Sequence, residues 1–122
     1  MMTHPSATGN LSDRTREFAS NVMSLVDQIE STRSNNLIAR QVIRSATCTG
    51  ASYREGRRAR SRSEFISKLS LSLQELEETR YWLELIESRG LADVSSLLKE
   101  ADEITAMLNS SVTTARKNMN HR

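Results

Sequence analysis

The helical organisation of this chain is clearest in the stretch Arg44–Leu69, RSATCTGASYREGRRARSRSEFISKL. Small residues at its start give way to a cluster of arginines and then to a new helix start. Ser61 and Glu64 have the spacing of a capping box, in which a serine caps a helix and a glutamate three residues later reaches back to it. The stretch therefore predicts a helix that ends near Ala59, a corner, and a second helix that begins after Ser61.

Downstream of this corner, apolar residues recur with the period of an α-helix. We expect the helix after Ser61 to continue to Arg89 and to stop at Gly90, because glycine favours the left-handed conformation that follows many helices. A last helix is predicted over residues 93–118, where the apolar residues form a single stripe.

Upstream of the corner, the same reasoning predicts two more helices. One covers residues 36–59. The other begins at Leu11, with Ser12 as its N-cap, and is followed by a turn over residues 31–36. Residues 1–10 are polar and without period, so we expect a loosely held tail.

Four helices joined by short links favour an all-α fold, and the simplest arrangement is an antiparallel up-down-up-down four-helix bundle. The 122 residues contain only four glycines and one proline, which disfavours a loop-rich β fold. We expect one domain over residues 11–119, between an N-terminal tail (1–10) and a C-terminal tail (120–122).

The predicted helix over residues 61–89 has two apolar sides, and a single core cannot use both unless this helix is central. The alternative is that its second side contacts another subunit. The second side is formed by Leu71, Trp82, Leu85 and Ile86, which we expect to form an oligomer interface rather than a cofactor pocket.

The net charge of +2 conceals a strong polarity along the chain. Residues 33–68 hold nine basic residues against two acidic ones, a net charge of +7, whereas residues 69–104 hold three basic residues against nine acidic ones, a net charge of −6. Such asymmetry indicates an anionic partner or contact between oppositely charged surfaces of two copies.

Four arginines of the predicted helix 36–59 lie on the side opposite its core face, each within roughly 40° of Arg40 on a helical wheel. We call them the arginine stripe: Arg40, Arg44, Arg54 and Arg58. At the corner the stripe is widened by Arg57, Arg60 and Arg62. Guanidinium groups pair with phosphates in a bidentate geometry, so these seven residues are the candidate nucleic-acid contacts. A solvated face, or pairing with glutamates of another subunit, is the alternative.

Catalytic and metal sites are not indicated. Cys48 is the single cysteine, which excludes an intrachain disulfide, and neither His4 nor His121 is placed to activate it. The carboxylates around Glu75 and Glu100 lack the Glu-x-x-His pairs of di-metal bundles, so we expect solvated or salt-bridged faces and neither metal nor cofactor.

Glu55 and Gly56 form a polar and small pair near the edge of the core. A glycine inside a helix costs roughly 1 kcal/mol relative to alanine, which indicates a packing reason for Gly56. We expect Glu55 to bond to a neighbouring helix, to Arg58, or to an arginine of another subunit.

Taken together, these residues resemble a known family. The segment from Gln41 to Ile86 is similar to the small bacterial four-helix-bundle proteins encoded by intervening sequences within large-subunit ribosomal RNA genes. The resemblance extends over about residues 18–117, with Glu103–Leu108 matching the fourth helix. The most specific matching positions are Arg44-Ser45, Gly50-Ala51, Tyr53-Arg54-Glu55-Gly56, Ser63-Glu64-Phe65-Ile66 and Glu78-Thr79 through Trp82-Leu83.

The resemblance implies an antiparallel bundle that often assembles as a homopentamer. A branch of similar fold, the accessory variability proteins of diversity-generating retroelements, binds nucleic acid and a reverse transcriptase through a basic surface. The density of arginines at residues 57–62 departs from the family pattern. It keeps nucleic-acid binding open without placing the chain in that branch.

We therefore expect a non-enzymatic homo-oligomer whose arginines bind a nucleic-acid backbone, RNA in preference to DNA. One rival is a protein-interaction module that docks an acidic partner such as a polymerase or reverse transcriptase. A second is an enzyme with a buried polar site, which has little support. With no apolar run long enough for a membrane span and no secretory leader, we expect a soluble cytoplasmic protein.

Overall fold

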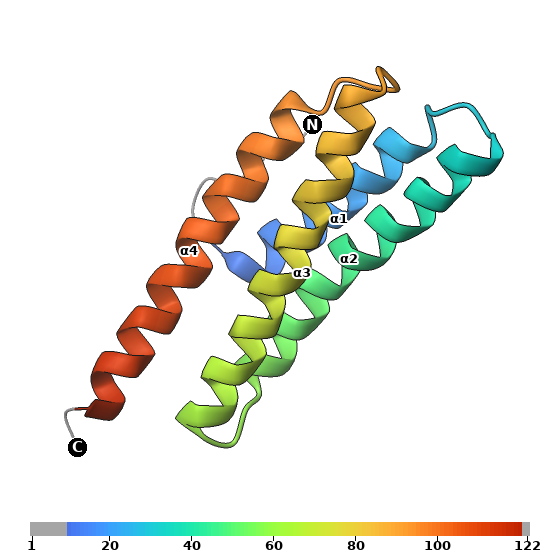
Figure 1. Cartoon of the computed structure of the whole chain (residues 1–122). Coiled ribbons are helices and arrows are strands. Elements are labelled where there is room, and N and C mark those ends of the chain that lie inside the picture. The colour runs from blue at the N-terminus through green and yellow to red at the C-terminus, as the bar shows by residue number, and fades with distance from the viewer. Residues whose placement is uncertain (1–9, 121–122) are drawn as a thin grey trace.

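Four helices account for nearly all of the described chain. The computed structural model describes residues 10–120, so the predicted tails (1–10 and 120–122) lie outside the described part except for Asn10 and Asn120. The helices are α1 (Leu11–Val26), α2 (Arg33–Arg57), α3 (Arg62–Ser88) and α4 (Ser95–Asn120). Successive helices run antiparallel, and α1 and α3 each contact both α2 and α4 (Figure 1). This arrangement confirms the all-α, up-down-up-down four-helix bundle.

Helix α1 begins at Leu11, as predicted, but its capping residue differs from the prediction, and α2 begins earlier than predicted. Asn10, not Ser12, caps α1, because its side-chain oxygen accepts the backbone N–H of Asp13 at 3.1 Å. Thr32 caps α2 by accepting the N–H of Asn35 at 3.1 Å. The second helix therefore begins inside the segment predicted to be a turn.

The corner between α2 and α3 agrees with the prediction. Ser61 is the N-cap of α3 and accepts the N–H of Glu64 at 3.0 Å, while the Glu64 carboxylate accepts the N–H of Arg60 at 3.1 Å. These reciprocal bonds satisfy backbone donors that the helix itself leaves unpaired.

The far end of α3 also stops where predicted. Gly90 adopts the left-handed conformation with φ of 67°, and its N–H donates to the carbonyl of Glu87. The N–H of Leu91 donates to the carbonyl of Ile86, which completes a Schellman motif. At the other end of the chain, α4 runs to Asn120, slightly beyond the predicted limit.

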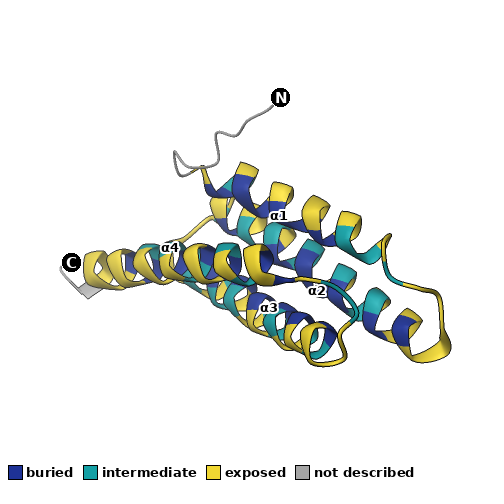
Figure 2. Ribbon diagram, turned by 90° about the horizontal axis from the view of Figure 1, so that it is seen from above, coloured by how far each residue is buried: buried dark blue, intermediate teal, exposed yellow. Residues whose placement is uncertain are grey.

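Helix α3 packs on two neighbours, α2 and α4, as every helix of the bundle packs on two others. Leu76, Leu83 and Ile86 are fully buried in one chain, whereas Leu71 of the second apolar side is 38% exposed, so the bundle covers that side only in part. Figure 2 shows the buried residues facing the interior and the exposed residues facing outward. Among the described residues, no helix combines the length and the apolar character that crossing a membrane requires.

Small residues bring α2 and α3 close together. A Cβ atom on Gly56 would lie 2.7 Å from Leu69 Cδ1, so glycine is the residue that fits here. Farther along the contact, Thr79 Oγ1 lies 2.7 Å from Ser45 Oγ, and the hydroxyl of Ser72 donates to the carbonyl of Thr49 at 2.7 Å. The fully buried hydroxyls of this contact are thus hydrogen-bonded, as buried polar groups generally are.

Candidate nucleic-acid interface

All seven arginines predicted as nucleic-acid contacts are exposed on the surface of the bundle. They do not have the same surroundings, however. Arg44 lies beside acidic residues of α3, and Arg40 lies apart from the other six. The remaining five arginines lie close together in the sequence at the corner between α2 and α3.

Arg44 is held by carboxylates of the same chain. Its guanidinium donates to Glu78 and, at 3.5 Å, to Glu75, both on α3. The hydrogen bond from Arg44, together with a weaker one from the indole of Trp82, lowers the pKa of the Glu78 carboxyl below its usual value. The middle of the arginine stripe is thus partly neutralised within one subunit.

Five arginines form what we call the arginine corner: Arg54, Arg57, Arg58, Arg60 and Arg62. They occupy positions within residues 54–62, at the end of α2, in the connection and at the first residue of α3. Arg57 Nη1 donates to the hydroxyl of Ser12 at 3.2 Å, which anchors it to α1. Within residues 10–120, none of the five side chains forms an ion pair.

The carboxylates near the arginine corner already have partners. Glu55 accepts from Lys68 Nζ of α3 at 2.9 Å, which is the bond to a neighbouring helix that the sequence predicted as one option. This contact raises the pKa of Lys68. Glu64 is engaged in the capping box. Neither carboxylate is paired with a guanidinium of the arginine corner, so these guanidiniums can pair with an outside anion.

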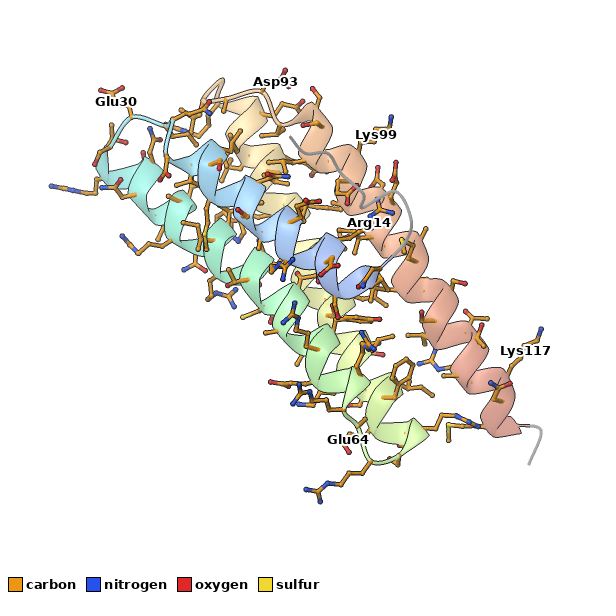
Figure 3. The ribbon with its side chains drawn as sticks, turned by 180° about the vertical axis from the view of Figure 1, so that it is seen from behind. Arg14, Glu30, Glu64, Asp93, Lys99 and Lys117 are labelled. Carbon is orange, nitrogen blue, oxygen red and sulfur yellow. The ribbon has the colours of Figure 1, made fainter. Side chains whose placement is uncertain are left out.

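The last turns of α4 lie at the same end of the bundle as the arginine corner. Figure 3 shows Glu64 and Lys117 at one end and Glu30 and Asp93 at the other. A groove of about 590 Å³ runs between α3 and α4 there, and both Arg62 and Phe65 line it. Arg116 of α4 and Ser63 of α3 line a second depression.

The predicted oligomer interface needs one correction. Ile86 is fully buried inside a single chain, because it continues the buried stripe of α3 that includes Thr79 and Leu83. Leu71 is 38% exposed, whereas Trp82 and Leu85 are half-buried against the core. The exposed Tyr81 packs edge-to-face on Trp82, with ring centroids 5.0 Å apart. An interface at Leu71, Trp82 and Leu85 stays a prediction.

The acidic residues compared above with the ligands of di-metal bundles pair with arginines, in agreement with the expected salt-bridged faces. Asp102 bonds to Arg80, and Glu100 and Glu103 bond to Arg14. Over residues 10–120, no cluster of His, Cys, Asp or Glu has the form of a metal site. Cys48 is a free, half-buried thiol, and both histidines lie outside the described residues.

Sequence reasoning missed Arg14, which joins α1 to α4 (Figure 3). Arg14 is only 7% exposed, and it donates to Glu100 at 2.7 and 3.0 Å and to Glu103 at 2.8 Å. These carboxylates raise the pKa of Arg14 further above its usual value. Its position on the apolar face of α1, in line with Leu11 and Phe18, was the available signal.

Comparison with known proteins now identifies the family. Residues 10–110 match the family described as 23S rRNA-intervening sequence protein. The chain belongs to that family. A crystal structure from Bacteroides thetaiotaomicron, described as a protein with unknown function from the S23 ribosomal protein family, is 32% identical to this chain, with a TM-score of 0.78. The match covers 84% of this chain and 97% of the other. A search of curated proteins found no match.

In this member of the 23S rRNA-intervening sequence protein family, the matched residues 10–110 contain the whole arginine corner. They end before Arg116 and the last turns of α4. The family resemblance predicted from the sequence is therefore confirmed. The arginine corner lies within the residues that match the family.

Proposed function

We propose that this protein is a non-enzymatic homo-oligomer whose arginine corner binds the phosphate backbone of nucleic acid, with structured RNA as the preferred ligand. The observation that carries the proposal is the set of five exposed arginines at one end of the bundle, beside carboxylates that already have partners.

The chemistry of the corner suits phosphate. Each guanidinium presents several N–H donors in a plane and stays charged at physiological pH. Because the five residues lie on two helix ends joined by a short link, their backbone positions are fixed before binding. Contacts of this kind do not depend on sequence and weaken steeply with salt.

Structured RNA is favoured over single strands for the main contact. No aromatic side chain interleaves the five arginines, whereas proteins that track single strands stack successive bases on aromatic rings. Proteins that bind duplex RNA read its shape and its phosphates. The family description also names an intervening sequence of 23S rRNA, which makes structured RNA the first ligand to test.

Oligomerisation would place several arginine corners in one particle and so raise its affinity for RNA. Five copies are the number implied by the family resemblance, and exposed Leu71 and Tyr81 give α3 an apolar surface that a second copy would cover. Linked binding sites raise the overall affinity without any new type of contact. In solution, light scattering should give a mass five times the 13.8 kDa of one chain.

The test is a titration of purified protein with a structured RNA at low salt. The Arg54→Glu/Arg58→Glu variant should lose most of the affinity. The Arg33→Glu/Arg89→Glu variant has the same change in charge at exposed positions of the opposite end, and it should bind like the wild type. Equal affinity of the two variants would contradict the proposal.

The rival function, docking of an acidic protein, predicts a different result in the same experiment. Wild-type protein would then bind RNA weakly at low salt and co-purify with one protein partner. Loss of that partner in the Arg54→Glu/Arg58→Glu variant would assign the arginine corner to a protein contact instead.

A further inference from the structure

The groove between α3 and α4 begins where the arginine corner ends. Arg14, in the first turn of α1, meets Glu103 and Met107 of α4, so the remainder of α4 extends past the start of α1 (Figure 1). Along this remainder the groove of about 590 Å³ opens between the first turns of α3 and the last turns of α4.

The lining of this groove is chemically mixed. Helix α3 contributes half-buried Phe65 and exposed Arg62. Helix α4 contributes small polar side chains at successive turns: Ser110, Ser111, Thr114 and Asn118. Hydroxyl and amide groups both donate and accept hydrogen bonds. The groove thus offers one aromatic ring, one guanidinium that stays charged at physiological pH, and a row of hydrogen-bonding groups.

A nucleobase fits this set of groups better than other ligand classes. A base has a flat face that stacks on an aromatic ring and an edge with donors and acceptors, and its phosphate carries the negative charge that arginine recognises. An apolar ligand would leave the hydroxyl and amide groups without partners. A metal ion would require carboxylates or histidines, and the described residues that line the groove include neither.

The position of the groove connects it to the proposed phosphate contacts. Arg62 belongs both to the arginine corner and to the lining of the groove. A nucleotide that leaves the end of a helical stem held at the corner would therefore reach Phe65 through the phosphate at Arg62. The run of arginines itself contains no aromatic residue, but Phe65 follows Arg62 by about one helical turn in α3.

We propose that the groove lined by Phe65, Thr114 and Asn118 binds an unpaired base of RNA, next to a stem whose backbone lies on the arginine corner. This inference rests on the proposed function and extends it. On this inference the protein recognises junctions between paired and unpaired RNA. The arginine corner binds the backbone of the stem, and the groove binds one unpaired base.

The test compares three RNA hairpins with the same stem. One has a blunt end, one has a short unpaired extension, and one has the same extension without bases. The wild type should bind the complete extension roughly 10-fold more tightly than the baseless one, the size expected for one stacked base. Since both extensions carry the same phosphates, the difference reports the base alone.

Variants separate stacking from folding. Phe65→Leu keeps an apolar side chain at a half-buried position and should abolish the preference for the base, whereas Phe65→Tyr should retain it. Should Phe65→Leu fail to fold, Thr114→Ala/Asn118→Ala changes exposed positions only and should reduce the same preference.

The outcomes distinguish the two proposals. Tight binding of all three hairpins without a preference for the base would overturn the base site and leave the corner standing. No binding of any hairpin at low salt would overturn both.

Discussion

Arg44 on α2 and Glu78 on α3 form an ion pair across the most extensive helix contact of the bundle, and Glu75 accepts a second bond from the same guanidinium. The pair divides the arginine stripe. Arg40 lies on one side of it, and the five residues of the arginine corner lie on the other. The positive surface is therefore concentrated at one end of the molecule instead of running along α2.

This division predicts that the arginines of the stripe contribute unequally to RNA binding. Because Arg44 would have to leave two carboxylates to reach a phosphate, Arg44→Gln should weaken binding less than Arg58→Gln, although each removes one charge. Fluorescence anisotropy at one salt concentration would measure both affinities. A larger decrease for Arg44→Gln would mean that the middle of α2, and not the arginine corner, makes the main contact with the RNA.

The same pair predicts how stability depends on pH. The pKa of Glu78 in the folded chain lies below its ordinary value of 4.5, so its charged form stabilises the fold above that pH. This contribution disappears as the pH falls through the lower, folded value. Stability of the wild type should thus decrease more steeply in acid than that of Glu78→Gln, as measured by urea unfolding at a series of pH values. Parallel pH profiles would contradict this prediction.

The partly buried ion pairs of Arg14 predict an effect on stability. Arg14→Met leaves the partly exposed Glu100 and Glu103 side by side without their cation, so the free energy of unfolding should fall by about 2 kcal/mol. Arg16→Met is the matched control on the same helix, because Arg16 is exposed and pairs with the exposed Asp13. Its effect should stay within about 0.5 kcal/mol. Similar decreases for the two variants would exclude a special role for Arg14.

The glycine between α2 and α3 predicts a packing effect. Gly56→Ala gains helix propensity but places a Cβ atom against Leu69, so the net result should be destabilisation by about 1 kcal/mol. Leu69→Val shortens the opposing side chain and should cost less in the Gly56→Ala background than in the wild type. Additive effects in this double-mutant cycle would show that the two residues do not compete for space.

Local features of the sequence predicted much of the fold. The capping box at Ser61 and the turn at Gly90 lie where expected, because each depends on hydrogen bonds within a few residues. The predicted cap of α1 was wrong by two positions: Asn10 and Ser12 are both good capping residues, and only the backbone conformation selects one.

The sequence alone could not predict the features of the candidate site that depend on contacts between residues far apart in the chain. The partner of Arg14 is 86 residues away, and no periodicity indicates which acidic residue it meets. Ile86 was assigned to the second apolar side, but it lies at the edge of the buried stripe of α3, and only the packing of the bundle shows how wide that stripe is. For the same reason, the groove that joins Phe65 to the end of α4 follows only from the packing of the two helices.

The most direct test of the central claim is the salt dependence of RNA binding. For the wild type, the logarithm of the affinity should fall linearly with the logarithm of the salt concentration. In Arg54→Glu/Arg58→Glu the slope should be shallower by roughly 0.7–0.9 for each phosphate that the variant no longer binds, whereas Arg33→Glu/Arg89→Glu should keep the wild-type slope. Identical slopes for all three proteins would contradict a phosphate-binding role for the arginine corner.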